Sequence, residues 1–475
     1  MSGLLKLRIF FAMADTLFDR KLSSPRDIPQ VEQVVADPFV GEYVERYSRS
    51  YVLQIVRVVF DQFRDRLKDG ETIDGAEIRQ TILDDLESER HKFFTSVVNC
   101  TGIVVHTNLG RSPLGRQRAQ TLLDKLTGYS NLEFDISTGK RGKRGSHVTR
   151  LFSLLTGAEA SCVVNNNAAA VYLILNTFCN GKECVVSRGE LVQIGGGFRM
   201  PDVMTASGAI LREIGTTNRV AFDNYYQAVG ENTGLIVKIH LSNFKLTGFT
   251  ESVDAKQLAA LGRERNIPVM YDLGSGSWLR PSDYGIKNEP SITNALDSGV
   301  DLVCFSGDKL FGGPQAGIIL GNADLIEKLH KNPLYRAFRP DKVTLLLLEE
   351  TLLSYLRGTE TLDSPAMTLL TTEIDKLKTR AERICASLGK AGIEADMLET
   401  TALAGGGSAP EEEMRSYGVR LNSKTKPDDL ACAFRSADPP IIGRIIDDKF
   451  VLDLKALLET EDEELTAAIK TILGK

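Results

Sequence analysis

The first hundred residues carry apolar side chains at helical spacing. Apolar residues recur at intervals of three and four through VEQVVADPFVGEYVERYSRSYVLQIVRVVFDQFRDRLKDG, and Gly70 ends the run. At about 100° per residue, four basic side chains fall on one side of this helix: Arg46, Arg57, Arg64 and Lys68. Such a stripe is either a nucleic-acid contact or a solvated face, and the nearby Glu42, Asp61 and Asp65 favour the solvated face.

From about residue 96 the pattern changes to short β-branched runs that alternate with helical stretches. The runs are VVNCTGIVVH, SCVVNNN, ECVVSRG, GLIVKIHLS, IPVMYDLG and DLVCFSG, and the helical stretches include AAAVYLILNTF and AKQLAALGRERN. This alternation predicts an α/β fold with a mostly parallel sheet covered on both faces. Ligands of such sheets gather at the carboxyl ends of the strands.

The C-terminal part predicts a small α+β domain. Two helical stretches, LLLLEETLLSYLRG and DKLKTRAERICASLG, precede a Gly-rich segment, AGGGSAPEEE, which we interpret as a linker. A hairpin, IIGRIIDDKFVLDL, and a final helix follow. The expected division is an N-terminal helical domain over 1–70, a helical linker over 71–95, a large domain over 96–343 and a small domain over 344–475.

Composition narrows the functional classes. The 475 residues are 42% hydrophobic and 25% charged, as in ordinary globular proteins, and the net charge of −6 argues against a general DNA-binding protein. The seven cysteines show no CxxC spacing and the five histidines no metal-ligand spacing, so we expect reduced thiols, a cytoplasmic protein and no metal site. No apolar run is long enough to span a membrane, and Lys6 and Arg8 interrupt the N-terminal apolar segment.

Two strand ends carry residues that suit pyridoxal phosphate. In DLVCFSGDKLFGGPQAG, Lys309 follows a strand, where a partly desolvated amine would have a lowered pKa and could form a Schiff base; simple pairing with Asp308 is an equal alternative. In IPVMYDLGSGSW, Asp272 ends a buried strand and could keep the cofactor's ring nitrogen protonated. An Asx turn is the other interpretation of that aspartate.

A third segment completes the set. In CVVNNNAAAVYLIL a strand stops at 165–167 and a helix begins at once. The free N–H groups at the start of this helix suit a phosphate, although an asparagine N-cap without a ligand would give the same sequence. The order phosphate cradle, pyridinium carboxylate, Schiff-base lysine is that of a pyridoxal-phosphate enzyme of the aminotransferase type. The expected cofactor-binding residues are Asn166, Asn167, Ala168, Asp272 and Lys309.

Longer motifs resemble a known family. NCTGIVVHTNLGRSPLG, VVNNNAAAV, VVSRGELVQIGGGFRMPDVM, IGTTNR, SNFKLTGFT, DLGSGS, FSGDKLFGGPQAG and PLYRAFRPDK are similar to segments of bacterial selenocysteine synthases, the L-seryl-tRNA(Sec) selenium transferases, over nearly the whole chain. The resemblance implies a fold type I pyridoxal-phosphate transferase. It also implies conversion of seryl-tRNA(Sec) to selenocysteinyl-tRNA(Sec), by β-elimination of the serine hydroxyl and addition of selenium from selenophosphate.

The resemblance also implies residue roles and partners. Lys309 would carry the cofactor and Asp308 would assist, as a proton donor or by tuning Lys309; the N-terminal domain would bind the tRNA, and the chain would form a homo-oligomer, a ring of dimers. Selenophosphate would bind three arginines: Arg111, Arg336 and Arg339. The last two are three residues apart, which on a helical turn would place both on one side, although two solvated arginines would look the same. Gln193 stands where an acidic residue is expected, and Lys245 where arginine is expected.

Two other functions stay open at this stage. One is a pyridoxal-phosphate lyase for a small amino acid or amino-sugar acid, which would not need the first hundred residues. The other is a catalytically silent RNA-binding protein on the same fold. The run KRGKR at 140–144 is either an RNA or phosphate contact or a solvated loop, and His106 is either near the cofactor or structural.

Overall fold

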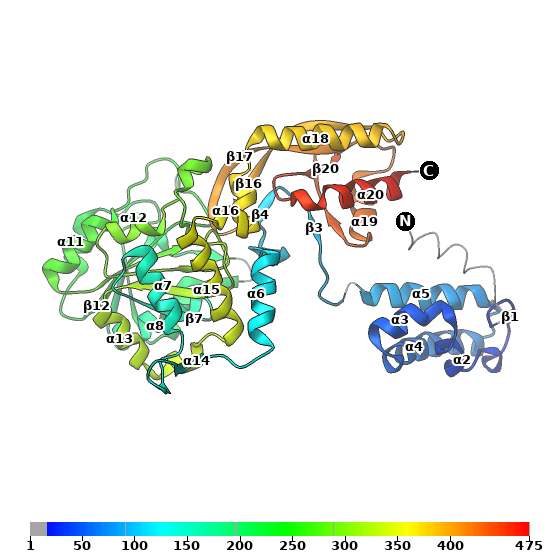
Figure 1. Cartoon of the computed structure of the whole chain (residues 1–475), viewed down its shortest axis with the longest axis horizontal. Helices are drawn as coiled ribbons and strands as arrows, with labels where there is room; N and C mark the ends of the chain where they lie inside the picture. The colour runs from blue at the N-terminus through cyan, green and yellow to red at the C-terminus, as the bar shows by residue number, and fades with distance from the viewer. Residues whose placement is uncertain (1–16, 91, 195–196, 288, 475) are drawn as a thin grey trace. The chain divides into compact units, whose positions relative to one another are not determined.

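The computed structural model describes residues 17–90, 92–194, 197–287 and 289–474, in two compact units that meet in sequence between Ser96 and Val97 (Figure 1). From residue 17 on, the first unit contains a short ladder, β1 (Lys21–Leu22) with β2 (Ile73–Asp74), and the helices α2 (Val31–Val35), α3 (Gly41–Tyr47), α4 (Arg49–Lys68) and α5 (Gly75–Arg90). The N-terminal helical region is therefore present as predicted.

The N-terminal unit differs from its prediction in two respects. Ser48 has φ of 102° and separates α3 from α4, so the run that looked like one helix is divided among α2, α3 and α4. Helix α5 packs against α4, and Ile82 and Leu86 join Phe60 in one core. The segment 71–95 was expected as a helical linker, and its helix belongs to the N-terminal unit, because its apolar residues complete the core that α4 leaves open.

The second unit is built on a seven-stranded sheet in the order β11-β8-β12-β13-β14-β15-β7. Its strands are β7 (Ala160–Val164), β8 (Glu183–Ser187), β11 (Ile210–Ile214), β12 (Thr233–Ile239), β13 (Val269–Gly274), β14 (Leu302–Ser306) and β15 (Gly317–Gly321). Every neighbouring pair is parallel except those that β15 makes with β14 and β7. The mostly parallel sheet is confirmed.

Alternating side chains of these strands enter two cores, one on each face of the sheet. On β14, Val303 and Phe305 join the core beneath α7 (Ser146–Thr156), α11 (Ala255–Arg265), α12 (Ile292–Asp297) and α15 (Lys342–Arg357). Leu302 and Cys304 join the opposite core, beneath α8 (Asn167–Cys179), α9 (Met200–Ala206) and α13 (Ala323–Lys331). Burial on both faces explains why these strands read as continuous apolar runs.

A five-stranded sheet of order β19-β20-β17-β16-β4 forms the C-terminal part. The long strands β16 (Ala395–Gly405) and β17 (Ser408–Leu421) pair antiparallel, so the Gly-rich segment that we interpreted as a linker is the turn of a hairpin. The predicted hairpin over 441–454 is present as β19 (Arg444–Ile446) and β20 (Lys449–Asp453), with Asp447 and Asp448 at positive φ in its turn. Helices α18 (Ile374–Gly389), α19 (Pro427–Arg435) and α20 (Asp462–Leu473) share its core.

The first strands after the N-terminal unit join the C-terminal part of the chain. Strand β4 (Ile103–Val105) pairs in parallel with β16, and β3 (Val98–Asn99) pairs with β18 (Ile441–Ile442). We had expected these residues in the large domain, but a β-branched run indicates a strand without indicating its sheet. Helix α15 packs on the core of the seven-stranded sheet, so we propose a large domain that extends beyond 343 to include it.

Candidate functional site

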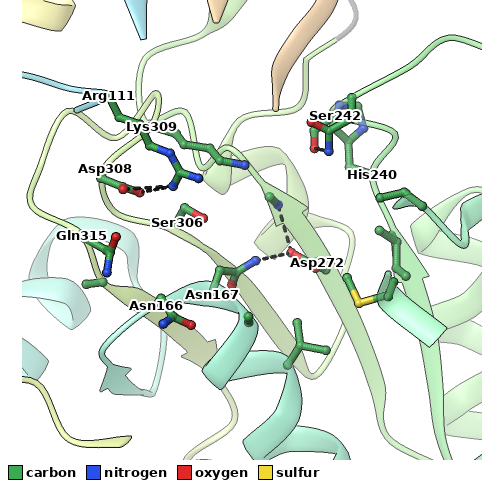
Figure 2. Close-up of a pocket in the computed structure, with 18 residues that line it drawn as sticks. Arg111, Asn166, Asn167, His240, Ser242, Asp272, Ser306, Asp308, Lys309 and Gln315 are labelled. Atoms are coloured by element: carbon green, nitrogen blue, oxygen red, sulfur yellow. Dashed lines mark hydrogen bonds and ion pairs between the residues drawn. The ribbon is translucent and has the colours of Figure 1, made fainter. Parts of the chain in front are cut away.

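A cavity of about 350 Å³ collects the residues expected to bind the cofactor (Figure 2). All five expected cofactor-binding residues line it, Asn166, Asn167, Ala168, Asp272 and Lys309, together with Asp308 and Arg111. The five cofactor-binding residues come from the end of β7, the start of α8, the end of β13 and the turn after β14. Chain order and strand-end placement therefore brought distant residues together as parallel-sheet geometry requires.

Lys309 is a buried amine. Only 7% of the residue is exposed, and its Nζ donates to the carbonyl oxygen of Gly407 at 3.2 Å. A Cβ on Gly407 would lie 2.6 Å from Nζ, so the glycine allows the β16-β17 turn to approach the amine. Burial, and next the charge of Arg111, lower the pKa of Lys309, with the surrounding carboxylates acting in the opposite direction. A lowered pKa increases the neutral, nucleophilic share of the amine.

Asp272 is a buried carboxylate with neutral hydrogen-bond donors. Its Oδ1 accepts from Nδ2 of Asn167 at 2.9 Å and from the N–H of Gly274 at 3.0 Å, and the residue is 3% exposed. Burial raises the pKa of Asp272, although these hydrogen bonds and Lys309 oppose the shift. Within the described part of the chain Asp272 has no ion pair at salt-bridge distance. A cationic ring nitrogen would supply the missing charge.

The start of α8 offers the cavity an anion site. Asn166 is the N-cap, and its Oδ1 accepts from the N–H of Ala169 at 2.8 Å, as the capping interpretation requires. The N–H groups of Asn167 and Ala168 have no acceptor within the helix, and both residues line the cavity. Oδ1 of Asn167 is buried without a hydrogen-bond partner. Capping and phosphate binding are thus compatible here, since different N–H groups serve them.

Arg111 pairs with Asp308 at the edge of this cavity. Its guanidinium Nη1 lies 3.1 and 3.0 Å from the two carboxylate oxygens, and Arg111 itself has a left-handed φ of 62°. Lys309 makes its hydrogen bond to Gly407 instead, so the alternative of a plain Lys309–Asp308 pair does not describe this structure. Figure 2 shows the contact between Arg111 and Asp308 as dashed lines.

The three arginines expected to bind one anion are not together in a single chain. Arg111 lines the cofactor cavity, whereas Arg339 lines a separate cavity of about 650 Å³. Arg336 lies in α14 (Pro333–Phe338), and Arg339 follows the helix with ψ of 134°, so the two arginines do not share a helical turn as we expected. The separate cavity also contains Arg141, Lys143 and Arg144 of the KRGKR run.

The basic stripe of the N-terminal unit is divided between two helices. Arg46 lies on α3, whereas Arg57, Arg64 and Lys68 lie on α4. Arg64 pairs with Asp61 at 2.7 Å and Lys68 with Asp65 at 2.8 Å. These exposed i,i+3 pairs have the form of a solvated face, so a tRNA contact through this stripe stays a prediction.

Of the two roles left open for His106, the structure supports the structural one, and the sequence reasoning missed several polar residues of the cavity. His106 accepts the N–H of Asn108 at 3.2 Å and caps a short turn, which is a structural role. His240, Ser242 and Asn243, which follow β12, line the cofactor cavity instead. The signal was available, because His240 is the first residue after a buried parallel strand next to β13, the strand that carries Asp272.

The described ranges contain neither a group of metal-ligating residues nor a candidate membrane-spanning helix. No group of three or more His, Cys, Asp or Glu residues there could hold a metal ion. Across the same residues, no helix combines the length and the hydropathy needed to cross a bilayer.

Comparison with known proteins adds to this geometry. A sequence profile described as L-seryl-tRNA selenium transferase matches residues 97–458, and one described as selenocysteine synthase N terminal matches residues 25–64. The chain is 43% identical to an L-seryl-tRNA(Sec) selenium transferase from Carboxydothermus hydrogenoformans, over 92% of this chain and 95% of that protein. It is 41% identical to an L-seryl-tRNA(Sec) selenium transferase from Caldanaerobacter subterraneus, over 94% of this chain and 98% of that protein.

A solved structure supports the fold. The structure of a D-glucosaminate-6-phosphate ammonia-lyase superimposes on this chain with a TM-score of 0.56. The superposition covers 81% of this chain and 97% of the lyase, and the two sequences are 17% identical. At that identity the likeness concerns architecture alone, and it agrees with a fold type I arrangement of the seven-stranded sheet.

Proposed function

Because the chain belongs to the L-seryl-tRNA selenium transferase family, we propose that it replaces the hydroxyl of serine esterified to tRNA(Sec) with selenium, giving selenocysteinyl-tRNA(Sec). Pyridoxal phosphate is the cofactor. The observation that carries the proposal is the cavity that unites a buried lysine of lowered pKa, a buried carboxylate and a helix N-terminus. These are the three groups that this cofactor requires.

The residues of the cavity fit the cofactor. When bound, pyridoxal phosphate supplies a carbonyl carbon for amines and a protonated ring that accepts electrons. Lys309 would hold the carbonyl carbon, Asp272 the ring nitrogen, and the first N–H groups of α8 the phosphate. The buried carboxylate of Asp272, which accepts hydrogen bonds from Asn167 and Gly274, fits a cationic ring nitrogen.

Lys309 is also the base that we assign to the α-proton of the seryl group. Its lowered pKa leaves more neutral amine to accept that proton near neutral pH. The hydrogen bond to the carbonyl oxygen of Gly407 holds Nζ when the lysine is not bound to the cofactor, so that it can accept the proton. Esterification to tRNA favours the step, because an ester acidifies the α-proton more than a carboxylate does.

Asp308 is assigned a supporting role. Both of its oxygens lie within hydrogen-bond distance of Arg111, so we infer that it orients that guanidinium and influences Lys309, in preference to donating a proton to the leaving hydroxide. Arg111, at the cavity edge, is positioned to bind an anionic oxygen of selenophosphate.

Arg336 and Arg339 require a further assumption. In one chain Arg339 faces a separate cavity, so their participation with Arg111 needs a neighbouring copy of the chain. The proposed assembly is a homo-oligomer, a ring of dimers, in which one copy supplies these two arginines to the cavity of another. Arg111→Ala and Arg339→Ala are then expected to raise the selenophosphate KM, and Arg339→Ala, whose residue lies outside the cofactor cavity of its own chain, should leave cofactor affinity unchanged.

The N-terminal unit is the proposed tRNA-binding part. It has its own core, made of residues between 18 and 86, which supports its removal as a whole. Deleting residues 1–96 should weaken tRNA binding and leave the cofactor bound; unchanged tRNA affinity would defeat this assignment. We propose the cytoplasm as the compartment, because the cysteines in the described part of the chain are free thiols.

A conversion assay tests the proposed function. Purified protein is incubated with labelled selenophosphate and either seryl-tRNA(Sec) or, as the control, seryl-tRNA(Ser), and the amino acid released from the tRNA is identified. Selenocysteine from the first tRNA alone is expected. No conversion by folded protein with bound cofactor would refute the proposal and favour a small-molecule lyase.

A further inference from the structure

Three hydrogen-bonded residues, Ser275, Glu289 and His240, lead to the cofactor cavity, which His240 lines. Nε2 of His240 lies 3.0 Å from Oε2 of Glu289, and Oγ of Ser275 donates to the other carboxylate oxygen. The side chain of Glu289 is fully buried and that of His240 is 17% exposed. Since a carboxylate only accepts, Nε2 carries the proton in this pair.

His240 lies at the strand end next to Asp272. Residue Ile239 of β12 is in register with Asp272 of β13, and the N–H of His240 donates to the carbonyl oxygen of Asp272 at 2.8 Å. His240 lines the same cavity as Asp272 and Lys309 (Figure 2). Among the described residues, Nδ1 of His240 has no hydrogen-bond partner.

We propose that His240 is a further cofactor-contacting residue, whose Nδ1, an acceptor when Nε2 carries the proton, would accept a hydrogen bond from the hydroxyl group of the bound cofactor ring, and that Glu289 is a positioning residue that fixes the imidazole through Nε2. The inference rests on the proposed cofactor but not on the tRNA substrate. A carboxylate that orients an imidazole through one nitrogen determines what the other nitrogen presents to a ligand.

A purely structural role is the competing explanation. Glu289 belongs to the loop before α12, and its bonds to His240 and Ser275 join that loop to the strand ends. In that case the pair would stabilise the fold, and any substitution that preserves the His240–Glu289 bond would leave cofactor binding unchanged. The two explanations therefore differ in which nitrogen of His240 matters.

Two amide substitutions separate the nitrogens. His240→Gln extends an amide to the position of Nε2, which keeps the bond to Glu289 and leaves the cavity side empty. His240→Asn places its amide near the position of Nδ1 and gives up the bond to Glu289. The matched control is Glu251→Gln, because Glu251 makes an exposed pair with Arg219 and lies outside the cofactor cavity.

The measurements are the dissociation constant of pyridoxal phosphate and the visible circular dichroism of the bound cofactor, together with the unfolding midpoint of each apoprotein. His240→Gln is expected to keep the midpoint, weaken cofactor binding by about threefold to tenfold, as for one lost hydrogen bond, and change the visible dichroism. His240→Asn is expected to bind the cofactor more tightly than His240→Gln, whatever its midpoint. Glu251→Gln should match wild type in every measurement.

Glu289→Gln tests the positioning role. It is expected to change the dichroism in the same direction as His240→Gln, and the double variant should bind the cofactor no more weakly than His240→Gln alone, because Glu289 acts through the histidine. Additive losses would overturn the positioning role. Wild-type affinity and dichroism in His240→Gln would overturn the contact itself.

These outcomes are separable from those of the proposed function. If wild type binds the cofactor and the variants behave as expected but no selenocysteine forms, the inference stands and the proposed substrate is wrong. If conversion occurs while His240→Gln keeps the wild-type dichroism, only this inference fails. If wild type binds no cofactor, both fail.

Discussion

Replacing Asp272 by asparagine should move cofactor affinity and apoprotein stability in opposite directions. The hydrogen bonds from Asn167 and from Gly274 both reach Oδ1 of Asp272, and Asp272→Asn retains an oxygen at that position. The change therefore removes a charge from a residue that is 3% exposed while keeping its shape. The bond to the cofactor's ring nitrogen, in contrast, loses its ionic character.

The affinity change follows from that loss. A hydrogen bond to a charged group contributes about 1.5–3 kcal/mol in a buried site, which corresponds to a loss of affinity of about 10- to 150-fold. Titration of the apoprotein with pyridoxal phosphate, followed by absorbance, measures it. An affinity within about threefold of wild type would refute the assignment of Asp272, since one lost charge pair exceeds that change.

The stability change has the opposite sign. Burial raises the pKa of Asp272, so the charged form is penalised in the folded apoprotein and this cost is present at neutral pH. Asp272→Asn should thus be at least as stable as wild type at pH 7 by urea denaturation. Its advantage should shrink as the pH falls and Asp272 becomes protonated. A marked loss of apoprotein stability at pH 7 would contradict the argument.

Three further predictions concern other parts of the chain. Lys309→Ala should abolish multiple turnover and prevent borohydride from linking the cofactor to the protein, as mass spectrometry would show; retained turnover defeats the assignment of Lys309. Burial lowers the pKa of Lys455 to about 8 from 10.5, so the unfolded state binds more protons between these values. The wild-type protein should therefore gain unfolding free energy relative to Lys455→Met as the pH rises, by up to about 3 kcal/mol between pH 8 and 10.5. A difference between the two proteins that does not change with pH in urea titrations would contradict this prediction. Gly276→Ala should lower the unfolding free energy by about 2 kcal/mol or more, because φ is +67° and the new Cβ would lie 2.2 Å from the ring of Phe305; a wild-type urea midpoint would rule this out.

The sheet and the cofactor site could be predicted because their signals are local. A strand that ends at Asp272, one that precedes Lys309 and one that stops before Asn166 must present these residues at one edge if the strands are parallel. The prediction needed no knowledge of strand order. The chemistry of a lysine, a carboxylate and a helix N-terminus then indicated which cofactor the site could bind.

The errors arose where a local pattern has two tertiary outcomes. The glycines before Ser408 suit a linker and a hairpin turn equally, and only the pairing of β16 with β17 decides between them. Arg339 continues a helical spacing from Arg336, but the backbone leaves the helix at Arg339. His240 was overlooked because its role depends on Glu289, 49 residues later in the chain.

The parallel pairing of β4 with β16 determines when the site can be completed during synthesis. Ile103 pairs with Leu403, 300 positions later, and the seven-stranded sheet already has its last strand at Gly321. A nascent chain can therefore assemble the sheet that carries Lys309 well before the partner of β4 exists. The turn that brings the Gly407 carbonyl to the amine arrives with that same partner strand. A chain that stops short of β16 would have the lysine but not the contact that holds it, so a competent cofactor site belongs to the nearly full-length chain.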